Sequence, residues 1–371
     1  AAPAPRAADA VPPPSLAGPV AEATAVFRRF AERLNPEAPV TVLCHSDADG
    51  LTSGALLIRA LERLGCGRVT PLVTNKGENA WGAAVRERLA ATAPAALFVA
   101  DLGSRDAPLL DRADVPTLLI DHHRPLGVPP GAELISGYGW DPIPNTSLLV
   151  YWLVAAVVPA DDLLWVAAVG TLSDLGERAP FAIVEAAKRV YTAKWLKETT
   201  ALLNAARRAA AMDTATALEA LLRSDGPRAL ADPATSPYAP TLQRYRDEVN
   251  AALAEARKAA PLFSGPVALV RIDTPCQIHP LIAQAWRGRL PKFIAICANE
   301  GYLPGRVSFS ARTSSAHNLL DFLAAARPEG DDTAEYGHGH DQASGGALSY
   351  TAWNRFLAGL GFPETALTSK G

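Results

Sequence analysis

The chain has 371 residues and a mass of 39.0 kDa, which is enough for two to three domains. Hydrophobic residues make up 49% of it and charged residues 20%, so a wholly disordered chain is excluded. The net charge of −3 argues against a protein that coats long nucleic acid through bulk charge, but it leaves room for a local basic groove.

Cysteine usage and hydropathy predict where the protein works. Its four cysteines, Cys44, Cys66, Cys276 and Cys297, are widely spaced and form no CxxC pair, which disfavours a disulfide scaffold or a cysteine zinc site and predicts a reducing compartment. The longest mostly apolar run, 148–160, is shorter than the roughly 20 residues of a spanning helix. No charged segment followed by an apolar stretch opens the chain, so we expect no secretory signal and a cytoplasmic location.

Strands and helices are predicted to alternate through the N-terminal half. A flexible lead-in and a first helix are expected over 1–35. Short apolar and β-branched runs then predict strands, and these lie at 39–44, 68–74, 95–100 and 116–120. An amphipathic helix is predicted at 53–64, and a buried helix at 148–170. Continuous apolar strands separated by helices indicate a parallel sheet covered on both faces.

The C-terminal half first becomes helical and then returns to strands. Residues 181–260 predict helices and a connector, with the expected seam between domains at 224–240. Further strands are predicted at 266–273, 292–299 and 306–312, with helices at 317–326 and 351–359.

The predicted fold class is α/β, with a parallel-sheet N-terminal domain and a smaller α/β C-terminal domain that contains a mixed sheet. The N-terminal domain is expected over 36–210 with flanking helices, a helical connector over 211–262, and the C-terminal domain over 263–371.

Histidines are few, and five of the seven fall in three clusters. The first cluster is HSDADG, residues 45–50, which follows a predicted strand. In an extended segment His45, Asp47 and Asp49 would project to one side, about 6.5 Å apart at about 3.3 Å per residue. This spacing suits two metal ions about 3.5–4 Å apart better than one ion. A polar turn with an N-cap aspartate is the alternative for this segment taken alone.

Further ligand-type side chains follow two other predicted strands. Asp101 comes after the strand at 95–100, and Asp121, His122 and His123 come after the strand at 116–120. Ligands of open α/β sheets gather at the carboxyl ends of strands. Asp174 ends a helical stretch, where a helix cap is the alternative. Carboxylates with imidazoles suit Mn²⁺ or a similar ion, and the lack of thiolates disfavours structural zinc, so a dinuclear metal site is predicted.

These motifs resemble those of the DHH phosphoesterase superfamily, in the same order. The matching segments are HSDADG, VADLG, the literal DHH at 121–123, and GTLSDLG. Downstream, GHGHDQASGG (337–346) resembles the glycine-histidine motif of the DHH-associated C-terminal domain, and SFSAR (308–312) resembles the strand before it. LNAARR (203–208) is similar to a stretch of RecJ-type exonucleases. The resemblance covers roughly residues 40–350.

The resemblance implies two divalent metal ions as cofactors, with Mn²⁺ expected first and Mg²⁺ or Co²⁺ as alternatives. One ion would be held by His45, Asp47 and Asp101. The other would be held by Asp49, Asp101, His122 and Asp174, so that Asp101 bridges the two. In such a site the ions activate water and neutralise charge on the phosphoryl oxygens.

The resemblance also implies roles beside the metals. His123 would lie next to the substrate phosphate and, with Asp101, is expected to be catalytic. Asp121 would support the loop or orient His122. In the C-terminal domain a terminal phosphate or the nucleotide backbone would be held by Arg312, His338, His340 and the backbone of Gly339, Gly345 and Gly346. A histidine-bearing surface loop is the alternative for this glycine-rich stretch.

The roles of four other residues are not fixed by the motifs. Asn204 and Arg208 would either touch phosphate or lie on a solvated helix. Lys76 is placed to line the cleft, and His279, before Pro280, is expected to cap or pack a helix start.

The function implied is that of a metal-dependent phosphodiesterase with its active site in the interdomain cleft. Full-length RecJ-type exonucleases carry an additional oligonucleotide-binding fold for which this chain lacks the length. We therefore expect a short single-stranded oligonucleotide, cleaved from one end, as substrate. The alternatives are hydrolysis of a small phosphorylated nucleotide or cyclic dinucleotide, and a non-catalytic nucleotide-binding or replication-associated protein. No membrane partner is expected, and a homodimer is compatible with the sequence.

Overall fold

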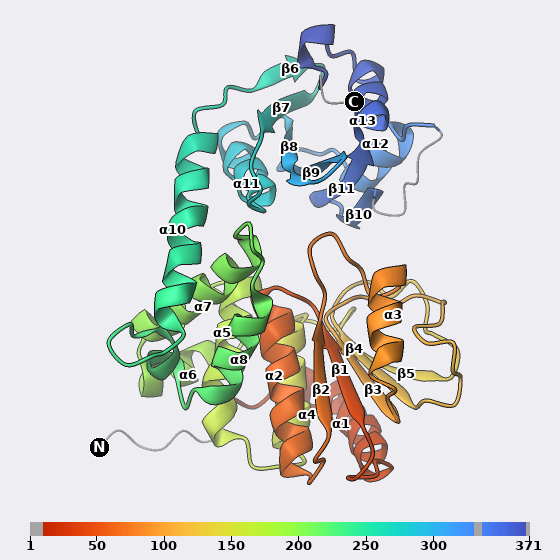
Figure 1. Cartoon of the computed structure of the whole chain (residues 1–371), viewed down its shortest axis with the longest axis vertical. Helices are drawn as coiled ribbons and strands as arrows, with labels where there is room; N and C mark the ends of the chain where they lie inside the picture. The colour runs from red at the N-terminus through yellow and green to blue at the C-terminus, as the bar shows by residue number, and fades with distance from the viewer. Residues whose placement is uncertain (1–9, 330–335, 369–371) are drawn as a thin grey trace. The chain divides into compact units, whose positions relative to one another are not determined.

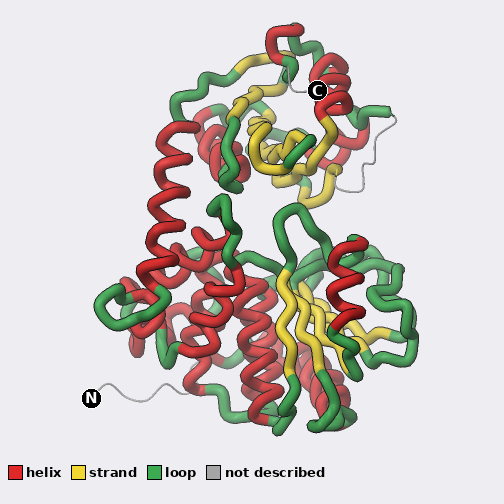
Figure 2. Tube along the Cα trace, viewed as in Figure 1, coloured by secondary structure: helices red, strands yellow, loops and turns green. Residues whose placement is uncertain are grey.

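The computed structural model describes residues 10–329 and 336–368, and the chain divides into two compact units (Figures 1 and 2). The first unit comprises residues 1–207 and 212–244, and the second comprises 208–211 and 245–371. Across the described ranges, no helix is both long and apolar enough to cross a membrane. All four cysteines are buried and free.

The first unit contains a five-stranded sheet in which every pairing is parallel (Figure 1). Its strands are β1 (Val40–Cys44), β2 (Val69–Val73), β3 (Ala96–Ala100), β4 (Thr117–Asp121) and β5 (Ala132–Ser136). They are arranged in the order β2-β1-β3-β4-β5. The four predicted strands are confirmed, whereas β5 was not predicted.

The alternation of side chains gives this sheet two apolar faces. Leu43 and Leu97 belong to a buried cluster with Val85, which lies on α3 (Ala83–Ala91). The neighbouring residue Phe98 instead packs edge-on against Phe30 of α1 (Ala17–Glu32), with ring centroids 5.0 Å apart. Helices therefore cover both faces, as the continuous apolar strands predicted.

Further helices complete the first unit. They are α2 (Ala48–Arg63), α4 (Thr146–Ala155), α5 (Leu164–Asp174), α6 (Ile183–Tyr191), α7 (Ala193–Arg208), α8 (Thr214–Arg223) and α9 (Pro227–Ala231). The single buried helix predicted at 148–170 is wrong, because α4 and α5 are separate helices. Pro159 lies between them, where it lacks an N–H donor and disfavours a helical conformation of the residue before it.

The second unit contains a six-stranded mixed sheet. Its strands are β6 (Leu262–Ser264), β7 (Val267–Ile272), β8 (Ile294–Leu303), β9 (Arg306–Thr313), β10 (Tyr336–His340) and β11 (Ala343–Ser349), in the order β10-β11-β9-β8-β7-β6. Strands β7 and β8 are parallel, and the other pairs are antiparallel. The helices are α11 (His279–Arg289), α12 (Leu319–Ala325) and α13 (Tyr350–Gly359). The predicted α/β class with a mixed second sheet is confirmed.

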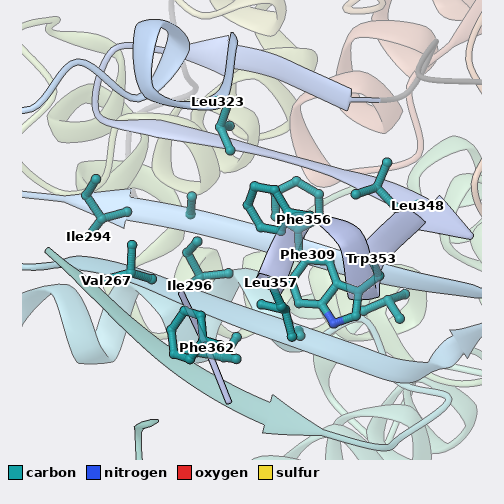
Figure 3. Close-up of a cluster of buried hydrophobic side chains, with 14 of the residues drawn as sticks. Val267, Ile294, Ile296, Phe309, Leu323, Leu348, Trp353, Phe356, Leu357 and Phe362 are labelled. Carbon is teal, nitrogen blue, oxygen red and sulfur yellow. The ribbon is translucent and has the colours of Figure 1, made fainter. Parts of the chain in front are cut away.

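An aromatic cluster joins α13 to the sheet of the second unit (Figure 3). The ring of Phe309 on β9 lies 5.4 Å from that of Trp353 and 5.7 Å from that of Phe356, both on α13. All three side chains are buried, and each fully buried side chain of this size contributes about 1.5–3 kcal/mol. This core holds β9, the strand that carries Arg312, in place.

The division between the two units falls within α10 (Ala239–Ala256), between residues 244 and 245. The predicted seam at 224–240 lies inside the first unit instead. This segment contains α9, which begins at Pro227 and buries Leu230. A proline at the first helical position is compatible with a helix start, so the glycine and prolines here do not mark a linker.

Candidate metal centre

The candidate site lies at the carboxyl ends of three neighbouring strands, β1, β3 and β4. His45 follows β1, Asp101 follows β3, and Asp121 is the last residue of β4. Strand β2 lies on one side of β1, and β3 lies on the other side of β1. The strand order therefore reverses between β1 and β3. In open α/β sheets this is where ligands bind. The topology therefore brings together residues that are far apart in the sequence.

The extended geometry predicted for HSDADG is wrong. Strand β1 ends at Cys44, and α2 begins at Ala48 rather than near Ser53. Asp47 is the N-cap of α2, and its Oδ1 accepts a hydrogen bond from the Gly50 N–H at 3.0 Å. Its other oxygen, Oδ2, lies 3.0 Å from His45 Nδ1. His45 and Asp47 thus meet through a helix cap, while Asp49 points from the first turn of the helix.

Asp49 is buried and anchored to the start of α4. Its carboxylate accepts hydrogen bonds from the Asn145 side-chain amide at 2.6 Å and from the N–H groups of Thr146 at 3.0 Å and Ser147 at 2.8 Å. These two N–H groups have no partner within the helix, and an acidic group there also interacts favourably with the helix dipole. A carboxylate from α2 is therefore fixed by a second helix.

Asp101 is buried in a conformation that few residues adopt. Its φ of 63° lies in the left-handed region, which costs a non-glycine residue about 1–2 kcal/mol. The Thr146 hydroxyl donates to its Oδ1 at 2.8 Å, and its Oδ2 lies 3.5 Å from His45 Nδ1. The backbone conformation and the Thr146 contact together fix the carboxylate beside His45.

Asp121 holds His123 and not His122, which corrects the predicted contact. Its Oδ1 accepts the His123 backbone N–H at 2.6 Å and lies 2.8 Å from His123 Nδ1. Its Oδ2 accepts the Gly103 N–H at 2.6 Å, so the loop after β3 is tied to the same carboxylate. The expected support of the loop is therefore present.

His122 lies between two carboxylates. Its Nδ1 is 3.6 Å from Asp49 Oδ2, and its Nε2 is 3.9 Å from Asp174 Oδ2. Asp174 is the last residue of α5, as predicted. Asn204 donates to Ser173 Oγ at 2.9 Å and so contacts the residue before Asp174.

The six predicted metal ligands and His123 form three overlapping groups of ligand atoms, with the atoms of each group within 4.8 Å of one another. The groups are His45 with Asp47 and Asp101, Asp101 with His122 and His123, and Asp49 with His122 and Asp174. Asp101 and His122 each belong to two groups. The arrangement therefore forms one continuous cluster instead of separate pairs.

The pKa values of the cluster's carboxyls shift in different directions, because burial and mutual repulsion raise them while neighbouring cations and N–H groups lower them. Burial and the charges of Asp101, Asp174 and Asp47 raise the pKa of Asp49 well above its usual range, although the Ser147 N–H opposes this. Burial also raises the pKa of Asp174. For Asp47 the effect of burial is outweighed by His45, Arg207 and the Gly50 N–H, which lower its pKa.

The two imidazoles beside these carboxylates favour the protonated form. Burial disfavours the charge on His45, but Asp47 and Asp101 outweigh it and raise the pKa to about 9. Burial likewise opposes charge on His123, but Asp121 raises its pKa to about 10. Both imidazoles are therefore protonated at neutral pH, which partly balances the negative charge of the neighbouring carboxylates.

The donor chemistry of the cluster fits divalent cations. Carboxylate oxygens and imidazole nitrogens in this mixture suit Mn²⁺ and related ions, and no thiolate is among them. Cations would relieve the repulsion that raises the pKa of Asp49. The residues present therefore fit a site for divalent metal.

The predicted substrate-binding residues of the second unit lie mostly on one part of its sheet. His340 pairs with Ala343, which pairs with Arg312, so these positions form one row across β10, β11 and β9. Arg312 Nη1 donates to Ser310 Oγ at 2.8 Å and to the Ala311 and Ser344 carbonyls. Burial, with the charge of Arg287, lowers the pKa of Arg312. The side chains of His338 and His340 lie outside the described residues.

The glycines of the β10–β11 hairpin are required by the packing of its strands. Gly345 pairs with Ser310, and a Cβ at Gly345 would overlap the Phe309 carbonyl oxygen. Gly339 has a φ of 138°, and a Cβ there would overlap the Ala343 carbonyl oxygen. Gly346 pairs with Tyr336 and Phe309. Gly339 and Gly345 were expected to let the backbone bind a phosphate. The structure shows that both are also needed for the close approach of neighbouring strands.

Three of the remaining predicted positions lie outside the metal cluster. Arg208 is the last residue of α7, and its carbonyl accepts the Gln277 N–H at 2.8 Å. Lys76 lies in the loop after β2. His279 is buried at the start of α11, with its ring 5.5 Å from that of Tyr302, so the predicted packing role is confirmed.

Sequence reasoning missed three residues of the site. Asn145 and Thr146 hold Asp49 and Asp101, and Arg207 Nη1 lies 3.7 Å from Asp47 Oδ2. The Asn-Thr-Ser sequence before the apolar run at 148–160 was a signal, because it is typical of a helix N-terminus. Arg207 lies within LNAARR (203–208), the segment similar to RecJ-type exonucleases, but its contact with Asp47 was not predicted because the two residues are distant in sequence.

Comparison with known proteins agrees with this geometry. Residues 39–171 match the model of the DHH family, N-terminal domain. This segment includes all five strands of the parallel sheet, β1 to β5, and every candidate metal ligand except Asp174. Among curated proteins, the search found no match to the chain.

Several solved structures have a fold similar to that of this chain. RecJ from Thermus thermophilus in complex with Mn²⁺ has 19% identity and a TM-score of 0.69 over 93% of this chain, which spans only 55% of that RecJ. An exonuclease RecJ bound to manganese has 20% identity and a TM-score of 0.61, covering 94% of this chain and 97% of its own. The DHH domain of a member of a family of ribosomal proteins has 14% identity and a TM-score of 0.68, covering 99% and 95%.

At these identities the solved structures establish a shared fold. The family match covers the strands and loops that carry the site, and the motifs that it contains are the ones whose side chains converge. Residues 39–171 are therefore a DHH-family N-terminal domain, and the chain shares its fold with RecJ and DHH-domain structures.

Proposed function

We propose that the protein is a metal-dependent phosphodiesterase that hydrolyses short single-stranded oligonucleotides from one end. The observation that carries the proposal is the continuous cluster of ligand atoms at the reversal point of the parallel sheet. The proposal is also supported by the similarity in fold to RecJ structures bound to manganese. We further propose that the protein acts in the cytoplasm.

The chain's own residues would hold two divalent ions. His45, Asp47 and Asp101 would bind one, and Asp49, His122 and Asp174, with Asp101, would bind the other. Bound divalent ions, with Mn²⁺ as the expected species, supply a Lewis acid that activates water and offsets charge on phosphoryl oxygens. Thr146 and Asn145 keep Asp101 and Asp49 oriented for this task.

His123 is the residue that we place against the substrate phosphate. Its Nδ1 is engaged by Asp121, so its Nε2 is the atom that would donate to a phosphoryl oxygen. The side chain is 41% exposed, whereas that of His122 is 11% exposed. His123 can therefore meet a ligand from solvent, while His122 remains among the carboxylates.

The test is hydrolysis of end-labelled single strands, from dinucleotides to long oligonucleotides, with Mn²⁺ and after chelation. We expect products released from one labelled end, no cleavage of a circular strand, and no cleavage after chelation. Asp101→Asn preserves the shape of the side chain but removes its charge. It should lower the rate roughly a hundredfold or more, because metal ions contribute several kcal/mol to transition-state stabilisation.

Three outcomes would contradict parts of this proposal. Cleavage of the circular strand at the same rate would exclude action from one end. Cleavage confined to dinucleotides, or to cyclic dinucleotides, would replace the oligonucleotide with a small nucleotide as substrate. A wild-type protein that binds Mn²⁺ but cleaves none of these would indicate a nucleotide-binding protein without catalysis.

A further inference from the structure

Arg207 is a cation placed against the ligand cluster. It lies on α7, and its Nη1 is 3.7 Å from Oδ2 of Asp47, the same oxygen that faces His45 Nδ1. Its side chain is 20% exposed, and its Nε is buried without a hydrogen-bond partner among the described residues. The contact with Asp47 is long and joins a single oxygen, so much of the guanidinium's bonding capacity is not used there.

If the site bound only metal ions, the positive charge of Arg207 would repel them. An arginine is always charged, and a half-buried charge needs a partner. When Asp47 shares its negative charge with a divalent ion, it becomes a weaker partner for Arg207. The guanidinium is then a positive group beside other positive charges. An anion that bridges the two would remove this conflict.

We infer that Arg207 binds a phosphoryl oxygen of the substrate beside the metal centre. This inference rests on the proposed function and extends it by naming a group that selects an anionic phosphodiester. Arginine suits the task because its planar fork of N–H donors matches phosphate oxygens in a bidentate fashion. Lysine at this position would keep the charge but lose that geometry.

The test compares three proteins with intact metal ligands: wild type, Arg207→Met and Arg207→Lys. Affinity for a labelled single-stranded phosphorothioate oligonucleotide is measured by fluorescence anisotropy, and affinity for Mn²⁺ by calorimetry. We expect Arg207→Met to bind the oligonucleotide about tenfold more weakly or worse, as for the loss of a charge-assisted hydrogen bond. Arg207→Lys should fall between the two. Arg189→Met, which removes an exposed charge on α6, should match the wild type.

Two further readouts separate substrate binding from a structural role. With uncharged methylphosphonate linkages, both proteins should lose the attraction between the phosphodiester and the ions, but the wild type should lose more affinity than Arg207→Met, because the variant has no arginine contact left to lose. Mn²⁺ binding by Arg207→Met should be unchanged or tighter, since a positive charge near the ions has been removed.

Weaker Mn²⁺ binding by Arg207→Met would overturn the inference and assign Arg207 to holding Asp47. Equal oligonucleotide affinity of wild type and variant would also overturn it, while leaving the proposed function intact. A wild-type protein that binds no oligonucleotide would contradict the proposed function, and the inference with it.

Discussion

Gly50 shows how a single residue joins the ligand loop to the helix that follows it. It lies in the first turn of α2, and its N–H donates to Asp47. A Cβ at this position would overlap the carbonyl oxygen and the Cβ of His45. The glycine is thus required by a close approach of two backbones.

Replacing Gly50 with alanine should therefore destabilise the protein and disturb His45 at the same time. We expect a loss of about 1–3 kcal/mol in the free energy of unfolding, because the overlap is with backbone that cannot rotate away. Urea unfolding measures this change. Gly18→Ala is the matched control, since Gly18 also lies in the first turn of a helix and a Cβ there would meet nothing within 4 Å. Equal effects of the two substitutions would show that helix propensity alone explains the result.

At the scale of elements, the start of α4 supports the ligands of two other elements. Asn145 and the first N–H groups of α4 bind Asp49 of α2, and the Thr146 hydroxyl binds Asp101 after β3. A partner that orients a ligand from behind contributes about 10–100-fold to metal affinity. The N-terminus of α4 therefore acts as a common support for the cluster.

We predict that Asn145→Ala weakens Mn²⁺ binding about 10–100-fold, since Asp49 loses a hydrogen bond that fixes its carboxylate. Calorimetric titration with Mn²⁺ measures the affinity. Asn354→Ala is the control, because Asn354 makes two hydrogen bonds to the Thr368 backbone in the second unit. Both variants should lose about 1–3 kcal/mol of stability, but only the first should lose metal affinity. Unchanged Mn²⁺ binding by Asn145→Ala would show that Asp49 is held well enough by α4 alone.

The sequence allowed the buried elements to be predicted better than the edge elements. Strands β1, β3 and β4 are continuous apolar runs, and their ends correctly indicated His45, Asp101 and Asp121. Strand β5, with its partly exposed Glu133, lies at the sheet edge and lacks that pattern. Strands β10 and β11 are rich in glycine, which has low strand propensity, and they are strands because β11 pairs along β9.

The parts of the site that the sequence did not reveal depend on long-range contacts. Asp49 was expected on a strand because its spacing from His45 and Asp47 suits one, yet the close packing of Gly50 allows the helix to start earlier. Asp121 was expected to support the loop or to orient His122; it supports the loop, and the turn after β4 brings the His123 N–H to it instead of His122. Arg207 meets Asp47 from another helix, and the LNAARR segment that contains it does not indicate this partner.

For the whole molecule, the charge of the candidate site is concentrated in one of the two units. Asp47, Asp49, Asp101 and Asp174 all belong to the first unit. Burial and repulsion raise the pKa of Asp49 and Asp174, so above those pKa values the ionised carboxyls oppose folding of the metal-free protein. Metal binding removes this penalty, but it must also displace protons from the cluster, including those on His45 and His123.

We therefore predict that Mn²⁺ stabilises the first unit selectively and more strongly as the pH rises from acidic to neutral values. At a hundred times its dissociation constant, an ion bound only by the folded state adds about 2.7 kcal/mol. Hydrogen exchange with and without Mn²⁺ resolves the two units. Protection should increase at residues 45–50, 101–103 and 121–123, and stay unchanged in the aromatic core around Phe309. Asp101→Asn should abolish the increase, since Asp101 belongs to two of the ligand groups. Equal protection of both units, or an effect that grows toward acidic pH, would contradict metal binding by these carboxylates.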